Sequence, residues 1–551
     1  MNNPGDRLAR AALALFAVFL VALKVWCILR YRFDSDEPQH LHVVWAWTRG
    51  LVQYRDVFDN HMPLFQMLCA PLLGVMGEHA QDLFWMRGLM LPLCFVSLWA
   101  TYRIGEKIFS RRVGIWSAIL LACYSNYHLC TTEFRTDDLW AALWLLGLLV
   151  LVSGPFEIQR ALVSGLLLGL CFGVSMKTTL MFLTIVTATV MAASVIGWSK
   201  VGLHGREVAK SVAAFLGAMA IVPAIIFAFF AAKGIWPQMR YCVFEHNFVA
   251  HRPSMRTPLH LLILPVALPL LVYGVRKVFR NRSRAPAAFR QFFLLFAAGA
   301  YVLLLHGLWG HITRQDYLPF YPLIALMAGA ALCAIPSFRL ANRIPAPALA
   351  AILIMAFSLG RHIPRTNGAA REIRIVREVL RITKPDDYVF DRKGEAVFRR
   401  RPVYYVLEVL TRERINRHLM VDDMVQRFVE TRTCVVVTGA HILVPDQHFI
   451  DANYLPGPER VRVAGYFLHP PAGEEETEFN VAIPADYVVI APEGNVTGML
   501  DGIPYEHARF LAAGKHRFRL TSPAQRLAIV WAPAVERNFS PFSRRHEPPH
   551  T

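Results

Sequence analysis

Charged residues are scarce in this chain of 551 residues, since only 18% are charged and 55% are hydrophobic. Soluble domains carry about 25% charged and roughly 45–50% apolar residues. A single soluble globule, a disordered chain and a disulfide-stapled secreted domain are therefore excluded. The apolar residues form long runs between about residues 11 and 360, and a water-soluble pattern follows. This distribution predicts a polytopic α-helical membrane protein with a soluble C-terminal domain.

Acidic residues are scarce in the first part of the chain. The first 360 residues hold 31 basic and 16 acidic residues, whereas residues 361–551 hold 27 and 24. A nucleic-acid-binding protein would gather such a basic surplus on one soluble surface. Here the surplus lies in short segments between apolar runs, as in the cytoplasmic loops of membrane proteins. We therefore predict membrane lipids as partners and no nucleic acid.

Cysteine is nearly absent from the soluble part, where Cys434 stands alone and an internal disulfide is excluded. The other eight cysteines lie mostly in apolar runs, where cysteine packs as a small hydrophobe. The sequence has no Cys-x-x-Cys pair and no Cys/His metal spacing. Clustered acids permit a divalent cation, but no ligand spacing demands one, so no cofactor is assigned.

Eleven apolar runs are long enough to cross a membrane, because about 20 helical residues span ~30 Å of hydrocarbon. The first is an expected anchor, since no small-residue cleavage site follows it. With the N-terminus in the cytoplasm, the short basic loops lie inside, which also puts the C-terminal domain outside. The runs begin near Ala11, Leu83, Ile115, Leu139, Ala161, Thr178, Ser211, Leu259, Gln291, Tyr317 and Ile344.

The predicted domains are a transmembrane domain over residues 1–360, with a first outer loop at 30–82, and two soluble lobes. Residues 361–475 have an α/β pattern, and residues 476–551 have the short strands of a β-sandwich-like lobe. In the outer loop, Trp45 and Trp47 suggest an interfacial helix whose aromatic face meets lipid, and a second short helix is expected after Pro63. In the β-rich lobe, one set of residues either binds carbohydrate or forms a packed core with ordinary turns: Asp501, Gly502, Tyr505, His516 and Trp531.

Three carboxylates follow the first membrane helix within four residues: Asp34, Asp36 and Glu37. Charges at the lipid boundary are costly unless they face water or a ligand. One carboxylate can take a proton from an incoming nucleophile while another holds the acceptor or a cation. The alternative is a solvated loop in which Asp36 caps a helix, since acids favour the first helical turn.

Four further charged segments reach the same membrane face in the predicted topology: residues 54–64, residues 133–138, Lys177 and residues 311–319. Each has a structural alternative. Arg135 can simply form an ion pair with Asp137 or Asp138 at a helix start. Lys177 can extend to the membrane interface, and His61 can be an exposed turn residue. Together, their basic side chains can bind a phosphate, and their acids can supply a base beside it.

These motifs resemble the GT-C class of integral-membrane glycosyltransferases, over roughly residues 10–360. The resemblance rests on the Asp36-Glu37 pair, an Arg-Asp-x-Phe-Asp-x-His-x-Pro-Leu string from Arg55 to Leu64, Arg135-x-Asp137, and Arg314 followed by Tyr317 and Pro319. The most similar branch is the bacterial part of the dolichyl-phosphate-mannose–protein mannosyltransferase family, which includes the lipid A aminoarabinose transferases. His61 and Met62 depart from the Lys-Pro of the aminoarabinose transferases.

The resemblance implies a GT-C-like fold in the bacterial inner membrane, with the C-terminal domain in the periplasm. It implies transfer of a monosaccharide from a polyprenyl-phosphate-linked donor to a lipid, glycan or protein acceptor. Asp36, Glu37 and Asp137 match the family's catalytic acids, with Asp36 as the base of an inverting single displacement. Lys177, Arg314 and His61 are the expected contacts to the donor phosphate. The expected substrate-binding residues are Asp59, Arg135, Asp138 and Tyr317.

Two other classes of function remain open from the sequence. Several membrane helices with a few charges suit a transporter or flippase, although neither an internal repeat nor broken midplane helices are evident. A non-catalytic subunit of a surface-glycan assembly machine is the other alternative. Such a subunit would tolerate the loss of Asp36 and Asp137, which distinguishes it from an enzyme. A simple carrier would have its charges near the middle of the membrane and would not usually carry a large soluble outer domain.

Overall fold

The computed structural model describes residues 4–201, 205–247, 272, 276, 285–310, 312–334, 345–439, 442–468, 476–492, 496–521 and 526–542. The chain forms two compact units. We call Met1–Arg32, Asp59–Cys69 and Phe84–Gly368 the helical unit, and Phe33–Phe58, Ala70–Leu83 and Ala369–Thr551 the α/β unit. Each unit is described by itself.

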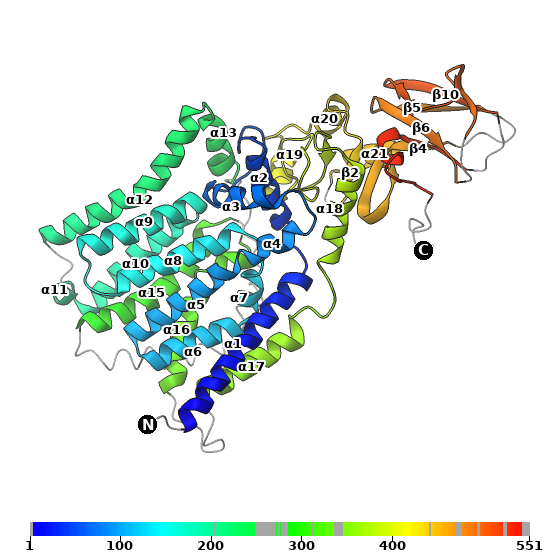
Figure 1. The fold of residues 1–551 in the computed structure, drawn as a ribbon. Helices are drawn as coiled ribbons and strands as arrows, with labels where there is room; N and C mark the ends of the chain where they lie inside the picture. The colour runs from blue at the N-terminus through cyan, green and yellow to red at the C-terminus, as the bar shows by residue number, and fades with distance from the viewer. Residues whose placement is uncertain are drawn as a thin grey trace. The chain divides into compact units, whose positions relative to one another are not determined.

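The helical unit is a bundle in which the long helices run alongside one another (Figure 1). Helix α9 packs on α8 and α12, α10 packs on α15, and α6 packs on α5 and α16. Two short helices, α3 (Leu64–Met76) and α4 (Asp82–Gly88), contain residues of both units. The other helices are α1 (Pro4–Arg30), α5 (Leu91–Ile108), α6 (Arg111–Cys123), α7 (Ser125–Cys130), α8 (Thr136–Val152), α9 (Ile158–Val174), α10 (Thr178–Ile196), α11 (Trp198–Val201), α12 (Arg206–Ala232), α13 (Trp236–Arg240), the π-helix η1 (Tyr241–Glu245), α15 (Ala285–Leu308), the 3-10 helix η3 (Arg314–Tyr317), α16 (Tyr321–Ala334) and α17 (Ala346–Arg361).

Small residues explain the close packing of α9 on α12. A Cβ atom on Gly165 would lie 2.3 Å from the carbonyl oxygen of Phe215, and one on Gly169 would lie 2.7 Å from that of Met219. Neither position has room for a side chain. Small residues at such contacts let two helix backbones approach closely inside a membrane.

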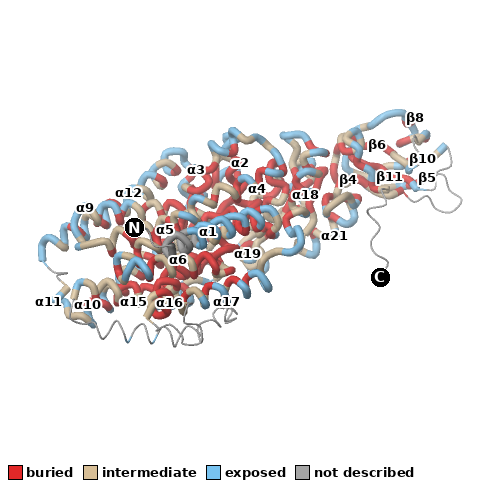
Figure 2. Tube along the Cα trace, turned by 60° about the horizontal axis from the view of Figure 1, so that its bottom comes forward, coloured by how far each residue is buried: buried red, intermediate tan, exposed pale blue. Residues whose placement is uncertain are grey.

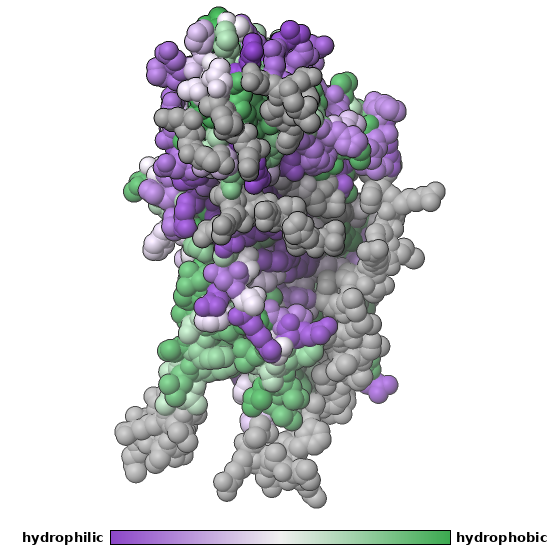
Figure 3. Space-filling model, turned by 90° about the vertical axis from the view of Figure 1, so that its right-hand side faces the viewer, coloured by the Kyte–Doolittle hydropathy of each residue, from purple (hydrophilic) through white to green (hydrophobic). Residues whose placement is uncertain are grey.

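Four helical segments among the described residues are long and apolar enough to cross a membrane: Asp82–Ile108, Thr178–Ile196, Arg206–Ala232 and Ala285–Leu308. Hydrophobic residues gather on the surface of the helical unit (Figure 3), and exposed positions follow α1 whereas α16 is mostly buried (Figure 2). The predicted run near Leu259 lies outside the described residues, and the other runs coincide with helices. The predicted total of about eleven crossings remains a prediction.

Two local predictions about this part of the chain are confirmed. The separate apolar runs predicted to begin near Ala161 and Thr178 form separate helices, because α9 ends at Val174 and α10 begins at Thr178. A short helix, α3, follows Pro63.

The prediction for the aromatic face of α2 (Asp36–Thr48) is wrong. The helix forms, but Leu41, Val44 and Trp45 are buried in protein instead of facing lipid. The indole nitrogen of Trp45 donates a hydrogen bond to Glu78, 2.8 Å away. A face of this composition is equally suited to a protein core, and here the α/β unit covers it.

The α/β unit contains a seven-stranded sheet and a four-stranded sheet. The larger sheet has the order β1-β2-β4-β11-β6-β9, with β3 paired to β4, and the smaller has the order β5-β10-β7-β8. The pairing of β1 with β2 is parallel, and the others are antiparallel. The strands are β1 (Val389–Phe390), β2 (Val435–Val437), β3 (Tyr454–Pro456), β4 (Val461–Leu468), β5 (Glu476–Val481), β6 (Ala485–Ile490), β7 (Gly498–Leu500), β8 (Ile503–Tyr505), β9 (Arg509–Leu511), β10 (Gly514–Leu520) and β11 (Leu527–Trp531).

Helices of this unit pack beside the larger sheet. The helices are α18 (Ala370–Ile382), α19 (Val409–Asn416), α20 (Met424–Glu430), α21 (Val444–Asn453), the 3-10 helix η5 (Pro458–Arg460) and α22 (Ala532–Val535). Apolar residues about one helical turn apart on α18, among them Ile375 and Val379, pack in the sheet core. Strand β4 pairs with β11, so residues from both sides of position 475 share one sheet. The C-terminal part of the chain is β-rich.

The buried Asp446 gives this unit an expected pH dependence. Burial and the nearby Asp422 carboxylate raise the pKa of Asp446 to about 7, and one of its carboxylate oxygens is buried with no hydrogen-bond partner among the described residues. A carboxyl group whose pKa is raised on folding stabilises the fold below its unfolded pKa, and this stability is lost as the pH rises through 7. We therefore expect a lower melting temperature at pH 8 than at pH 5.5.

The substitution Asp446→Asn should raise the melting temperature at pH 8 by about 3 °C and flatten its change between pH 5.5 and 8. Thermal unfolding of the full chain in detergent, followed by circular dichroism, measures this. The control is Asp451→Asn on the same helix, whose exposed carboxylate pairs with Arg462 at 2.6 Å. A pH dependence that persists in Asp446→Asn would show that another group causes it.

Candidate functional site

A charged network at the ends of α8, α9 and η3 centres on Lys177. Its ammonium pairs with the carboxylate of Asp316 and lies 3.5 Å from an oxygen of Asp137. The other oxygen of Asp137 accepts a hydrogen bond from Arg135 Nε at 3.2 Å. Both carboxylates are buried, whereas 15% of the Lys177 side chain is exposed. A cation therefore lies between two buried anions and remains partly accessible.

Arg314 forms a second charged group in the helical unit. Its guanidinium pairs with Glu133 and donates a hydrogen bond to the hydroxyl oxygen of Tyr31, 2.6 Å away. Gln315 donates to the other oxygen of Glu133. The Arg314 side chain is 25% exposed, whereas Glu133 is fully buried. Arg314 is therefore more accessible than Glu133, just as Lys177 is more accessible than Asp137 and Asp316.

Local sequence explains how these side chains are held. Thr313 and Asp316 form a reciprocal capping box around η3, in which Asp316 accepts the backbone N–H of Thr313 at 2.7 Å. The same carboxylate therefore caps a helix and pairs with Lys177. At the start of α8, Asp137 and Asp138 occupy the first turn, where the helix dipole favours negative charge.

His61 and Asp59 form a pair at the start of the segment that leads into α3. Nδ1 of His61 lies 2.8 Å from an oxygen of Asp59, and Gln66 donates a hydrogen bond to the other oxygen at 2.9 Å. Asp59 is fully buried, whereas 22% of His61 is exposed. The simple exposed-turn interpretation of His61 is therefore wrong, because a buried carboxylate orients its ring.

Two other predicted substrate-binding residues are buried. Both carboxylate oxygens of Asp138 lack a hydrogen-bond partner among the described residues. The Tyr317 hydroxyl lies 2.8 Å from Nε2 of His306. Their predicted role in substrate binding remains a prediction. His311, from the segment that carries Tyr317, lies outside the described residues.

The acidic cluster after α1 belongs to the α/β unit. Asp34 accepts a hydrogen bond from the backbone N–H of Asp36 at 3.2 Å, and Glu37 accepts one from that of Asp34 at 2.8 Å. Asp36 instead pairs through its carboxylate with the ammonium of Lys393. The alternative from the sequence holds in part, since Asp36 and Glu37 occupy the first turn of α2, but the N-cap position is Ser35 and not Asp36.

No group of three or more His, Cys, Asp or Glu side chains with metal-binding geometry occurs among the described residues. Three buried acids of the helical unit pair with Lys and Arg: Glu133 with Arg314, Asp137 with Arg135 and Lys177, and Asp316 with Lys177. The arrangement is that of a charge-balanced, partly accessible network of cations that can bind an anionic group.

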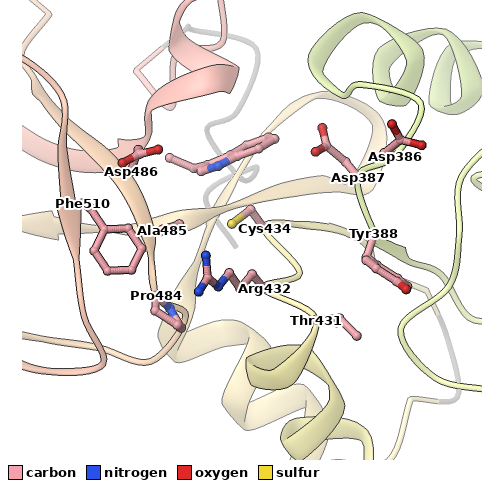
Figure 4. A pocket seen from close by; sticks show the side chains of 11 residues that line it. Asp386, Asp387, Tyr388, Thr431, Arg432, Cys434, Pro484, Ala485, Asp486 and Phe510 are labelled. Carbon is pink, nitrogen blue, oxygen red and sulfur yellow. The ribbon is translucent and has the colours of Figure 1, made fainter.

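The α/β unit has a separate cavity of about 360 Å³. In Figure 4, Phe510 and Asp486 lie on one side of it and Asp386, Asp387 and Tyr388 lie on the other, with Arg432 between them. Of the aromatic residues that the sequence singled out in the β-rich lobe, Trp531 lines this cavity. The buried hydroxyl oxygen of Tyr505 accepts a hydrogen bond from the backbone N–H of Val489 at 2.7 Å, and His516 pairs with Asp501 at 2.8 Å, as expected of a packed core with ordinary turns.

Glu133 and Asp316 lie in charged segments that the sequence singled out, but neither was assigned a role of its own from the sequence. The Thr313-x-x-Asp316 spacing is a capping-box pattern and was a usable signal. Tyr31 and Lys393 were missed altogether, and Tyr31 carried no signal beyond its position just before the acidic cluster. Lys393 lies 357 residues from Asp36 in the chain, and nothing in its neighbourhood marks it.

Comparison with known proteins supports the fold but no sequence family. No protein-family model matches the chain, and no curated protein matches it. The structure is similar to ArnT, an aminoarabinose transferase, from Cupriavidus metallidurans in the apo state, with a TM-score of 0.59 and 14% identity over 83% of this chain and 98% of that chain. ArnT from the same organism bound to undecaprenyl phosphate gives a TM-score of 0.56 and 13% identity, with the same coverage.

A weaker similarity links the chain to the oligosaccharyltransferase of Archaeoglobus fulgidus in the apo form, with a TM-score of 0.47 and 11% identity over 83% of this chain and 73% of that one. The fold expected from the sequence motifs is therefore confirmed by the similarity to ArnT. With its long apolar helices and β-rich C-terminal part, the chain is an integral membrane protein with the fold of the GT-C glycosyltransferase ArnT.

Proposed function

We propose that this protein is a glycosyltransferase that moves a monosaccharide from a polyprenyl-phosphate-linked donor to an acceptor at the periplasmic face of a bacterial inner membrane. The observation that carries the proposal is the partly exposed pair of cations, Lys177 and Arg314, each held by buried carboxylates. They occur in a chain with the fold of ArnT, a protein that has been solved with undecaprenyl phosphate.

The donor phosphate is the natural partner of these cations. Guanidinium and ammonium groups form short, charge-assisted hydrogen bonds with phosphate oxygens. Arg135 pairs with Asp137, the same carboxylate that Lys177 contacts. We assign His61, which pairs with Asp59, a secondary role at the phosphate. Because the donor's lipid tail stays in the membrane, its phosphate reaches the protein at the interface. This is where a membrane-embedded transferase needs positive charge.

Asp36 is the proposed base, and Glu37 and Asp137 are the other two proposed catalytic acids. Its carboxylate takes a proton from the acceptor hydroxyl or amine, and the acceptor atom forms a bond to the anomeric carbon of the sugar. The bond between this carbon and the phosphate oxygen breaks, and its electron pair leaves on the phosphate. Polyprenyl phosphate is already a stable anion, so no general acid is needed. One displacement inverts the anomeric configuration.

We also propose three substrate contacts because of where they lie in the structure: Asp59, Asp138 and Tyr317. Asp59 orients His61, and Asp138 follows Asp137 in the first turn of α8. We assign them support of the donor site. The identity of the sugar and of the lipid, glycan or protein acceptor is the object of the following experiment.

Mass spectrometry of lipid A and of surface glycans from a deletion strain tests the function. The proposal predicts that one sugar substituent is lost, that the wild-type gene restores it, and that a gene carrying Asp36→Asn does not. If the deletion strain keeps every sugar substituent, the proposed function is wrong. If Asp36→Asn restores the sugar fully, a transporter or a non-catalytic subunit is favoured over an enzyme with this base.

The proposed orientation makes a separate prediction. A reporter that is active only in the periplasm should be active when fused after Phe357 and inactive when fused near Arg284. The reason is that Lys and Arg accumulate in cytoplasmic loops, and the segment around Arg284 is strongly basic. Reporter activity in matched whole-cell assays, normalised to fusion protein abundance, measures this. The opposite pattern would invert the proposed topology.

A further inference from the structure

A loop of the α/β unit, residues 391–401, which we call the 391–401 loop, lies against helix α2 and brings Lys393 to Asp36. The ammonium of Lys393 pairs with the Asp36 carboxylate. The two side chains are 13% and 17% exposed. This contact joins the C-terminal part of the unit to the proposed base.

The 391–401 loop has a fixed backbone. The fully buried carboxylate of Asp391 accepts hydrogen bonds from the backbone N–H groups of Gly394 and Ala396, at 2.6 and 2.7 Å. It also pairs with the guanidinium of Arg401 at 3.0 Å. One side chain thereby ties three points of the loop together, so the position from which Lys393 extends is well defined.

Gly394 allows the loop to approach α2 closely. Its φ angle is +99°, which is a conformation that residues with a Cβ rarely adopt. A Cβ atom here would also lie 2.8 Å from the Cα atom of Gln39 and 3.2 Å from the carbonyl oxygen of Pro38. Both reasons restrict this position to glycine, and the close approach places the neighbouring Lys393 beside the first turn of α2.

The docking of the loop does not depend on Lys393. Nδ1 of His42, on α2, lies 2.6 Å from the carbonyl oxygen of Val397, and burial lowers the pKa of His42 to about 4, so this ring is neutral and donates at neutral pH. The buried Arg399 pairs with Glu78 at 3.1 Å. These contacts fix the loop without the Lys393–Asp36 pair. A largely desolvated ion pair adds little stability that apolar packing at the same place could not also supply.

We propose that Lys393 is a positioning residue for Asp36, which holds its carboxylate ionised and in a fixed orientation for the acceptor. The inference rests on the proposed function, because it requires Asp36 to be the base. During transfer the acceptor's proton moves to Asp36, the ion pair with Lys393 weakens, and loss of this proton to water restores it. Lys393 stays protonated throughout and forms no covalent bond.

The test is the pH dependence of kcat in the purified full chain carrying Lys393→Met, which keeps the length of the side chain and removes its charge. Because a nearby cation favours an ionised carboxylate, we expect the acidic limb of the profile to move upward by about one pH unit and kcat at pH 7 to fall about tenfold. KM for the donor should stay the same, since Lys393 acts on the base. Lys393→Arg should recover most of the activity.

The charged residues next to Asp36 and Lys393 in the sequence are Asp34, Glu37, Arg392 and Glu395. Arg392 and Glu395 pair with each other at 3.2 Å, and none of the four is altered by the test. The matched control is Lys384→Met, an exposed lysine of the same unit, which should leave the profile unchanged. Melting temperatures of all three variants show whether each is folded.

The outcomes separate this inference from the proposed function. If Asp36→Asn abolishes transfer but Lys393→Met keeps the wild-type profile, or only raises KM for the donor, Lys393 does not position the base and the inference fails alone. If Asp36→Asn is fully active, the assignment of the base fails and the inference falls with it. If Lys393→Met does not fold, Lys393→Arg decides: a folded variant with a wild-type profile supports the role of the charge, and an inactive one contradicts it.

Discussion

Replacing Asp36 with asparagine should lower the rate of sugar transfer by about a thousandfold, because an amide cannot accept the acceptor's proton. Positioned general bases typically contribute about 10²–10⁴-fold. The substitution preserves the shape of the side chain, and the bonds at the start of α2 come from Asp34 and Glu37. The variant should therefore fold, insert into the membrane and bind the donor lipid. Single-turnover assays with the purified protein measure the rate.

Asp34→Asn is the matched control for this prediction. It is the same chemical change two residues earlier, and its amide oxygen can still accept the hydrogen bond from the backbone N–H of Asp36. We expect its rate to lie within about threefold of wild type, since only a cap is perturbed. Wild-type turnover by folded Asp36→Asn would remove Asp36 as the base.

Lys177→Met should weaken the binding of polyprenyl phosphate by about a hundredfold and also destabilise the helical unit. Removing one partner of a buried charge pair costs about 3–5 kcal/mol, because the remaining charge is left uncompensated. Here Asp316 would lose the ammonium that pairs with it, and Asp137 would keep Arg135 but lose Lys177. Equilibrium binding of polyprenyl phosphate and the melting temperature measure the two effects.

A double variant separates binding from folding. Adding Asp316→Asn to Lys177→Met removes the excess negative charge while the amide oxygen still accepts from Thr313. We expect stability to recover and lipid phosphate binding to stay weak. Lys210→Met is the control, because this exposed lysine pairs only with Glu207 in the same helix, at 2.7 Å, among the contacts described. Unchanged affinity in the folded double variant would contradict a phosphate role for Lys177.

The helices of this protein were predictable because their cause is local. Long apolar runs separated by basic segments coincide with helices such as α10 and α15, and the turn at Lys177 follows from one charge that interrupts an apolar run. Strand β2 was recognisable as a run of buried valines. Such patterns reflect whether a segment lies in lipid, in water or in a protein core, and the amino-acid composition of the segment follows this environment directly.

The partners within the networks were not predictable, because they depend on contacts between distant segments. Lys177 lies 139 residues before Asp316, and Glu133 lies 181 residues before Arg314. Charge alone indicated that each residue would need a partner, but not which one. The Arg135–Asp137 pair, two residues apart, was foreseen for this reason.

The aromatic face of α2 shows a different limit. Trp45 and its neighbours suit a membrane interface and a protein core equally well, because both remove an aromatic ring from water while leaving its N–H a polar partner. Only the fold supplies Glu78 as this partner. The same holds for Lys393, whose role depends on a loop that Asp391 and Gly394 hold against α2.

The most direct test of the account is a reaction of the purified protein with polyprenyl-phosphate-linked sugars and acceptor lipids extracted from the deletion strain. The account predicts that one polyprenyl phosphate forms for each sugar transferred and that the anomeric configuration is inverted. It also predicts that Asp36→Asn forms polyprenyl phosphate and the glycosylated acceptor about a thousandfold more slowly. Intact donor at the end of the reaction, or donor carried unchanged across the membrane of a reconstituted vesicle, would contradict it.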